Sequence, residues 1–404
     1  MKRILFVDDE PQLLDGLRTR MRRMRGAWEM EFAPSGQDAI ARLELNPFDV
    51  IVVDQRMPEM DGATLLHVVL TRWPRTVRIV LSGYAELEQT MRLVPVAHQY
   101  ISKPCDPVRL ENAIERCLGL QQLLQRPALR EAVGRLGPLP PAPATFAQLQ
   151  VAMSSETSSV GEIARLVARD TIITAKLLQI VNSGFFRLPR RISSVEQAVS
   201  YLGLNTVRNL VVSAEVFAKW PNGGPDSSAT LAFLQDHASL TAAAVVRLMP
   251  GSPFVSDALL AALLHDIGYW VLIHGCSDEL CSARALAVSE SIPLDIAEQR
   301  VLGASHAEIG AYLLGIWGFP SSIVEAVAHH HSPHGVPQHE FDALAALCIA
   351  HALVEPAENG AFPALSVPHS EISADYLETV SAPFSWEEAK GRVTPLFSTG
   401  ESSS

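Results

Sequence analysis

Short apolar runs that end at a polar residue are the feature that most constrains this chain. ILFV precedes Asp8 and Asp9, VIVV precedes Asp54, VRIVL precedes Ser82, and QYIS precedes Lys103. Apolar runs of this length, separated by helix-length segments, are typical of buried strands in a parallel α/β sheet. The carboxyl ends of parallel strands meet at one edge, where such sheets bind ligands. We therefore expect these carboxylates, a hydroxyl and an ammonium to meet there, as a site for a cation and a phosphate group.

Residues 1–124 predict five strand–helix units, and this alternation is typical of a doubly wound parallel sheet. The strands are expected near 3–8, 28–33, 50–54, 77–81 and 99–102. The helices are expected near 11–24, 36–44, 61–71, 86–94 and 107–124. Asp106 followed by Pro107 is a typical helix start, because aspartate caps the helix and proline suits its first turn.

The residue types at the strand ends predict a specific chemistry. Mg²⁺ prefers oxygen ligands and keeps several waters, so Asp8, Asp9 and Asp54 can supply the carboxylates that it needs. A carboxylate can also attack a phosphoryl group and form an acyl phosphate. Lys103 and the metal would meet the charge that develops on the transferred oxygens, and Ser82 can donate to one of them.

The motifs around these residues resemble the receiver domain of two-component response regulators. The resemblance covers residues 1–124 and rests on VDDE (7–10), VDQRMPEMDG (53–62), LSGYAE (81–86) and YISKP (100–104).

This resemblance implies a role for each member of the site. The members are the phosphoacceptor Asp54, the acidic Mg²⁺ ligands Asp8 and Asp9, the backbone carbonyl of Arg56 as a further ligand, and Ser82 and Lys103, which contact the phosphoryl group. Tyr100 matches the aromatic residue that changes position when such a domain is switched. Lys103 and Pro104 match a peptide bond that is cis in this family, an isomer found almost exclusively before proline.

The chain changes character after residue 124. Residues 126–143 carry five prolines and two glycines, which predicts a linker over 125–143 that contains the end of a connecting helix. Residues 144–354 lack strand signals and predict an all-α domain, in which Ser194 to Gln197 have the spacing of a capping box. Residues 355–404 predict two short helices, within 372–380 and 385–393, and a flexible tail.

Histidines in the second domain are candidates for a metal site. The apolar segment ALLAALL ends at His265 and Asp266, and His237, His306 and the run 329–331 come from other helices. Neighbouring residues on a helix point about 100° apart, so His265 and Asp266 can share a pocket only at the helix end. Helical proteins build metal sites from such residues, and a bound iron, manganese or zinc ion could activate water for phosphodiester hydrolysis. In the alternative interpretation they are hydrogen-bonded core residues, with exposed imidazoles at 329–331.

The second domain resembles the HDOD domain, a branch of the HD phosphohydrolase superfamily that serves as an output or signalling module. The resemblance covers about 135–354 and rests on LGPLPPAPATFAQL (136–149), VNSGFFRLPRRISSVEQAVSYLGLNTVRNLV (181–211), LLHDIG (263–268), HAEIGAYLLGIWGFP (306–320) and AHHHSP (328–333).

Comparison with catalytic members of that superfamily leaves metal binding open and predicts that efficient catalysis is absent. The matching ligands are His237, His265 and Asp266, whereas His351 stands where the catalytic enzymes have a later aspartate. His306 and His330 match additional histidines of the HD-GYP phosphodiesterases. Tyr269 follows HDIG at the position where the HD-GYP phosphodiesterases have a lysine. The GYP signature of those enzymes is also absent after His331.

Composition excludes several classes of function. A net charge of −12 argues against bulk binding of nucleic acid or membrane, and the cluster of arginines between residues 18 and 25 fits a solvated helix end. The five cysteines lack paired CxxC spacing and no signal peptide begins the chain, which favours a cytoplasmic location. No uninterrupted apolar run approaches the ~20 residues that span a bilayer.

The sequence thus predicts a response regulator that a sensor histidine kinase phosphorylates on Asp54. Its HDOD domain would bind an unknown downstream signalling protein, and a homodimer remains open. The alternative is a receiver-gated, metal-dependent phosphodiesterase that acts on a nucleotide such as a cyclic dinucleotide. A DNA-binding regulator is disfavoured, because no basic helix-turn-helix module follows the receiver.

Overall fold

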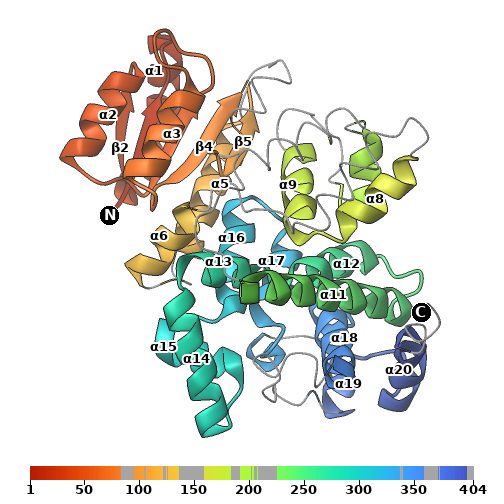
Figure 1. The fold of residues 1–404 in the computed structure, drawn as a ribbon. Coiled ribbons are helices and arrows are strands. Elements are labelled where there is room, and N and C mark those ends of the chain that lie inside the picture. Colours follow the sequence, from red (N-terminus) through yellow and green to blue (C-terminus); the bar gives the residue numbers. More distant parts are fainter. Residues whose placement is uncertain are drawn as a thin grey trace.

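The computed structural model contains an α/β domain followed by a helical domain (Figure 1). It describes residues 1–82, 93, 96–103, 106–121, 124, 126–135, 159–182, 192–201, 203, 207, 225–336, 340–358, 372 and 374–397. Several predictions lie outside these residues: most of the helix near 86–94, the cis bond to Pro104, residues 136–143 of the linker and the end of the tail.

The α/β domain is built on a parallel sheet with the strand order β2-β1-β3-β4-β5. The strands are β1 (Lys2–Val7), β2 (Trp28–Ala33), β3 (Val50–Asp54), β4 (Val77–Ser82) and β5 (Gln99–Ser102). Residues of β1 alternate between the two faces: Ile4 and Phe6 join one buried cluster, and Leu5 and Val7 join the other. The predicted doubly wound sheet is confirmed, and its order places β1 beside β3, so that Asp8 and Asp54 lie at neighbouring strand ends.

Helices flank this sheet near the predicted places, but two of them end earlier than expected. They are α1 (Pro11–Arg20), the 3₁₀ helix η1 (Met21–Gly26), α2 (Gly36–Leu45), α3 (Gly62–Arg72) and α5 (Pro107–Leu120). The helix expected over 11–24 ends at Arg20. There the Met21 N–H donates to the carbonyls of both Leu17 and Thr19, and the chain continues as the tighter 3₁₀ helix η1. The helix expected over 107–124 ends at Leu120.

The second part of the chain is helical, as predicted. Its helices are α6 (Pro127–Arg135), α8 (Val160–Ala168), α9 (Thr171–Val181), α11 (Pro225–Leu248), α12 (Val255–Leu264), α13 (Ile267–Gly275), α14 (Ser277–Glu290), α15 (Leu294–Leu302), α16 (His306–Ile316), α17 (Ser321–His329), α18 (Ala343–Glu358), α19 (Ala374–Thr379) and α20 (Trp386–Val393). Short 3₁₀ helices follow at η2 (Pro333–Gly335) and η3 (Thr394–Leu396). The continuous apolar pattern over 163–182 breaks at the buried Asp170, whose carboxylate accepts the N–H groups of Ile172 and Ile173 and opens α9.

The stretch Val255–Gly275, which covers α12 and α13, is long and apolar enough to cross a membrane. However, 78% of its apolar window is buried inside the fold, as expected of a helix pair in a protein core.

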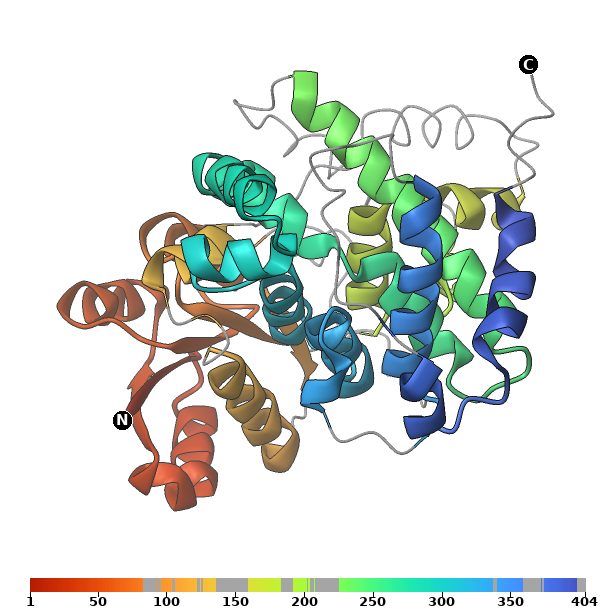
Figure 2. The same cartoon turned by 90° about the horizontal axis from the view of Figure 1, so that it is seen from below.

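Helices α5 and α6 lie between the sheet and the helical domain, and both views place α5 beside α16 (Figures 1 and 2). Leu124, Leu129 and Val133 belong to a buried apolar cluster that includes both the sheet and the helical domain. The two domains are therefore packed through one continuous core rather than joined by a loose tether.

Candidate functional site

The acidic residues and Lys103 meet at the carboxyl edge of the sheet. The Lys103 Nζ atom lies 2.7 Å from Asp8 Oδ2 and 2.5 Å from Asp54 Oδ1. Carboxylate oxygens of Asp8, Asp9 and Asp54 lie within 4.8 Å of one another. Such a set of oxygen donors fits a small divalent cation such as Mg²⁺.

Burial and pairing set the charges at this edge. Burial raises the pKa of the Asp54 carboxyl above its usual range, although Lys103 acts against this shift. Burial by itself would lower the pKa of Lys103, but its hydrogen bonds to Asp54 and Asp8 outweigh this effect and raise it. The ammonium therefore stays charged beside the carboxylate that would receive a phosphoryl group.

The remaining predicted residues of this site lie on the same strands and loops. Asp54 Oδ2 accepts a hydrogen bond of 3.0 Å from the Arg56 N–H. Ser82 ends β4, but its side chain lies outside the described residues. Tyr100 lies within β5 and is buried, and this burial raises the pKa of its phenol.

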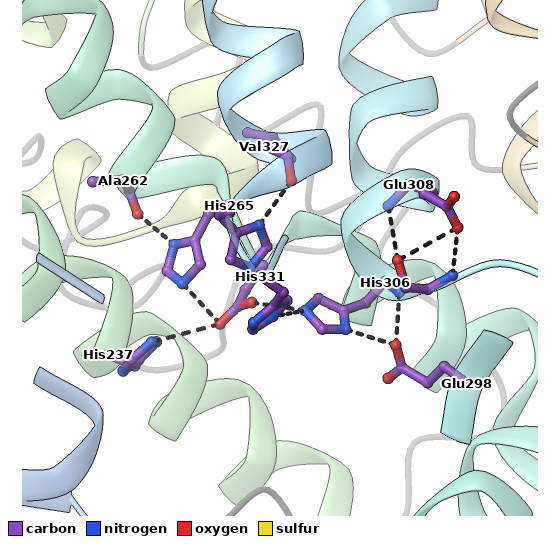
Figure 3. Close-up of polar contacts among 11 residues, drawn as sticks. His237, Ala262, His265, Glu298, His306, Glu308, Val327 and His331 are labelled. Atoms are coloured by element: carbon purple, nitrogen blue, oxygen red, sulfur yellow. Dashed lines mark hydrogen bonds and ion pairs between the residues drawn. The ribbon is translucent and has the colours of Figure 1, made fainter. Parts of the chain in front are cut away.

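Seven buried residues of the helical domain form a second group, which we call the histidine cluster. Its members are His237, His265, Asp266, His306, His330, His331 and His351. They come from α11, the turn between α12 and α13, the start of α16, the end of α17, and α18. Figure 3 shows the rings of His237, His265, His306 and His331 facing one another. The predicted exposure at 329–331 is wrong for His330 and His331, which are 1% and 6% exposed.

The hydrogen bonds of two rings leave their second nitrogen facing the cluster. His265 Nδ1 donates to the Ala262 carbonyl at 2.8 Å, and His330 Nδ1 donates to the Val327 carbonyl at 2.7 Å. Burial lowers the pKa of His265 to about 4 and that of His330 well below its usual value, so both rings are neutral. Both Nε2 atoms are therefore lone-pair acceptors, and both are buried without a hydrogen-bond partner among the described residues.

The Asp266 carboxylate lies among these rings. Its oxygens are 3.3 Å from His265 Nε2, 3.6 Å from His306 Nε2 and 4.0 Å from His237 Nε2. Burial alone would raise the pKa of Asp266, but the surrounding imidazoles outweigh it and lower the pKa to about 2. A neutral His265 and a charged Asp266 both offer acceptors to the same small space, which favours a cation between them.

Glu298 on α15 was not predicted from the sequence, yet it holds His306. Its carboxylate accepts hydrogen bonds from the His306 backbone N–H at 2.8 Å and from the His306 Nδ1–H at 2.7 Å. Burial favours a neutral ring, but the Glu298 charge outweighs it and raises the pKa of His306 to about 9. His331, named in the sequence only as part of a run, lies with its Nε2 atom 2.9 Å from His306 Nε2.

Gly268 allows the two halves of the cluster to approach. A Cβ atom at this position would lie 1.9 Å from the His306 carbonyl oxygen, so no side chain fits there. Its neighbour Tyr269 stacks on the His306 ring, with ring centroids 4.1 Å apart. The HDIG sequence thus places α13 directly against the start of α16.

Comparison with known proteins assigns both domains. A family model for the response regulator receiver domain matches residues 4–115, and one for the HDOD domain matches residues 139–333. A CheY-like receiver domain protein from Methanospirillum hungatei is 31% identical, with a TM-score of 0.29, over 30% of this chain and 97% of that one. The chain is a response regulator with a receiver domain and an HDOD domain.

Two further relatives show how far the similarity of this response regulator extends. The MmoQ response regulator from Methylococcus capsulatus is 20% identical, with a TM-score of 0.48, over 63% of this chain and 97% of that one. The hydrogenase transcriptional regulatory protein HoxA from Cupriavidus necator is 33% identical over 41% of this chain and 37% of its own length. The response regulator thus spans well under half of that curated relative.

Proposed function

We propose that a sensor histidine kinase switches this response regulator by phosphorylating Asp54, and that the HDOD domain passes the signal to a partner protein. Strand β5 carries this proposal. Lys103, which contacts Asp54, directly follows β5, and Tyr100 within β5 lines a cavity whose other wall belongs to the HDOD domain. A change at Asp54 therefore reaches the domain interface through one short strand.

The chemistry assigned to the receiver residues is phosphoryl transfer. An Asp54 oxygen attacks the phosphorus of the kinase phosphohistidine, the P–N bond breaks with its electrons going to the imidazole, and an acyl phosphate forms. Lys103 is already within contact of Asp54 and meets the added negative charge. Asp8, Asp9, Asp54 and the Arg56 carbonyl would hold Mg²⁺, which, when bound, neutralises phosphoryl oxygens.

A small phosphodonor tests this proposal directly. Full-length protein incubated with acetyl [³²P]phosphate and Mg²⁺ should gain label, and Asp54→Ala should remain unlabelled. Asp15→Ala is the matched control, because Asp15 is exposed and its described ion pair is with Arg18 on α1. Hydrogen exchange in α5 and α16 should change on labelling in the wild type alone. An exchange response that survives in Asp54→Ala would contradict the proposal.

The histidine cluster favours a second candidate function, a metal-dependent phosphohydrolase acting on a nucleotide such as a cyclic dinucleotide. The supporting observation is the pair of partnerless Nε2 atoms on His265 and His330 beside the Asp266 carboxylate. Imidazole and carboxylate donors suit iron, manganese or zinc. Such an ion, when bound, would supply an activated water. Glu298 would then hold the His306 ring in the orientation that a metal ligand needs.

Two features weigh against efficient catalysis at this cluster. His351 supplies an imidazole where catalytic relatives have a carboxylate, and Tyr269 covers one face of His306. Elemental analysis of untagged full-length protein distinguishes a metal centre from a metal-free histidine cluster. Iron, manganese or zinc near one equivalent or more, lost in His265→Ala and His330→Ala but kept in the exposed control His67→Ala, would support a metal centre. Hydrolysis of a cyclic dinucleotide by the loaded protein would establish the enzyme, and metal-free wild-type protein would eliminate it.

A further inference from the structure

A cavity of about 410 Å³ lies between the receiver and the HDOD domain. One wall comes from β5 and α5, and the other from α9, α12 and the segment between α16 and α17. Small-molecule sites usually have volumes of roughly 300–1,000 Å³ and often lie between domains. The cavity is therefore large enough for a ligand that contacts both domains at once.

Three polar side chains of α5 line this cavity without using their donors. Arg109, Asn112 and Arg116 are spaced three and four residues apart, so they lie on one face of the helix. None of the three has a hydrogen bond or ion pair with another described residue. The Arg116 Nε atom is also buried without an acceptor in the part of the chain that the structure describes.

The acidic residues of the cavity wall already accept hydrogen bonds. Asp257 accepts from the Ser322 hydroxyl at 2.7 Å, and Asp106 accepts from the Val108 N–H at 3.0 Å as the cap of α5. Neither carboxylate pairs with Arg109 or Arg116 among the described ion pairs. Among the described residues, these carboxylates therefore leave the charges of Arg109 and Arg116 available to an anion.

Two further cations lie at the same domain interface. Arg78 is 1% exposed, and its guanidinium contacts only carbonyl oxygens and His98 in the described chain. Lys176 lies over the Trp317 ring at 4.1 Å, and burial lowers its pKa to about 7. Buried positive charge such as that of Arg78 makes this interface attractive to an anion.

Aromatic side chains form the apolar part of the same cavity. Tyr100 comes from the receiver, and Trp317 and Phe319 come from the HDOD domain. Flat aromatic groups of a ligand stack well on such side chains, as nucleic-acid bases do.

We propose that this cavity binds a small ligand with a phosphate group and a flat aromatic ring, the chemistry of a mononucleotide. Arg116 contacts the phosphate, Arg109 adds positive charge on the same helix face, and the aromatic side chains hold the ring. Binding here involves neither phosphorylation of Asp54 nor the histidine cluster. Because the ligand contacts both domains, it would stabilise their present packing.

Calorimetric titration of the full-length protein with AMP and GMP, in buffer with EDTA, tests the proposal. EDTA removes any metal from the histidine cluster, so that cluster cannot hold a nucleotide through an ion. Adenosine, guanosine and inorganic phosphate serve as ligands that lack either the phosphate or the ring. We expect AMP or GMP to bind with a submillimolar Kd, at least tenfold more tightly than its nucleoside and than phosphate.

Variants place the binding in the cavity. Arg116→Gln should weaken nucleotide binding at least tenfold, and Arg109→Gln should weaken it several-fold. Neither arginine makes a contact that the fold needs, so both variants should fold, which circular dichroism checks. Arg22→Gln, at an exposed arginine of η1 outside the cavity, should leave the affinity unchanged. Absence of binding by either nucleotide, phosphate binding of equal strength, or full affinity in Arg116→Gln would each overturn the proposal.

Discussion

Arg78 of the receiver donates a hydrogen bond of 3.0 Å to the Gly134 carbonyl, which lies 56 residues further along the chain. Arg78 belongs to β4, and Gly134 lies near the end of α6, the helix that follows the receiver. The same guanidinium also donates to the carbonyls of Val96, Pro74 and Thr76. One buried cation therefore joins the sheet, a receiver loop and the interdomain helix.

Replacing Arg78 by methionine should destabilise the protein. The change leaves four carbonyls without this donor, and the loss should exceed the gain from removing a buried charge. We expect the free energy of unfolding to fall by about 2–4 kcal/mol, measured by urea denaturation. Arg75→Met, at an exposed neighbour, should change it by less than about 0.5 kcal/mol. Equal effects of the two variants would contradict this role of Arg78.

A methyl group at Gly134 should separate α6 from the receiver. A Cβ atom there would lie 1.8 Å from the Pro74 carbonyl oxygen, a backbone atom that cannot turn aside. Gly134→Ala should therefore increase hydrogen exchange in α6 and protease cleavage between the domains. In Gly119→Ala the new methyl group meets nothing within 4 Å, so this α5 variant should keep wild-type protection. Unchanged exchange in Gly134→Ala would show that the close contact is not maintained in solution.

Neutralising Asp8 should weaken Mg²⁺ binding to the receiver. Asp8 is 1% exposed and contributes one of the three carboxylates that lie within 4.8 Å of one another. Asp8→Asn should raise the Kd for Mg²⁺ at least tenfold in calorimetric titration, because a hard cation loses a charged ligand. Asp15→Asn on α1 should bind as the wild type does. If Asp8→Asn retained wild-type affinity, the metal would have to lie elsewhere.

The Glu298–His306 pair should make stability depend on pH in metal-free protein. Glu298 raises the pKa of His306 from its ordinary value of 6.5 to about 9. Protonation of His306 therefore stabilises the fold fully below pH 6.5, and this contribution is lost as the pH rises through 9. The loss should be on the order of 2–3 kcal/mol in EDTA-treated protein.

Urea denaturation at pH 6.5 and pH 9 measures this effect, and Glu298→Gln supplies its test. The variant removes the charge that holds the proton, so its stability should change much less over the same interval. A pH dependence that is the same in both proteins would assign the effect to other groups.

The receiver site could be predicted because its residues follow local patterns. Asp54 and Lys103 each come directly after an apolar run, and parallel strands bring such positions to one edge whatever the details of packing. The same reasoning placed His265 and Asp266 at a helix end, which is where the structure has them.

Residues that act through tertiary contact were beyond sequence reasoning. Glu298 precedes His306 by eight residues in a different helix, and nothing in its own surroundings distinguishes it from an exposed acid. Arg78 interrupts an apolar strand, yet the sequence does not reveal that α6 supplies one of its acceptors. Such roles depend on how the domains pack, which periodicity does not encode.

The packing of α6 against both domains limits how such proteins can be recombined. Arg126, just before α6, donates to the Val301 carbonyl at the end of α15, while Gly134 at the other end of α6 touches the receiver. A chimera that exchanges the receiver alone would replace Pro74 and Arg78, which both contact Gly134 of α6. Exchanging α6 together with the receiver would instead break the hydrogen bond from Arg126 to Val301. A well-coupled hybrid therefore has to preserve the contacts of α6 on both sides, and a junction placed before residue 124 preserves only those to the helical domain.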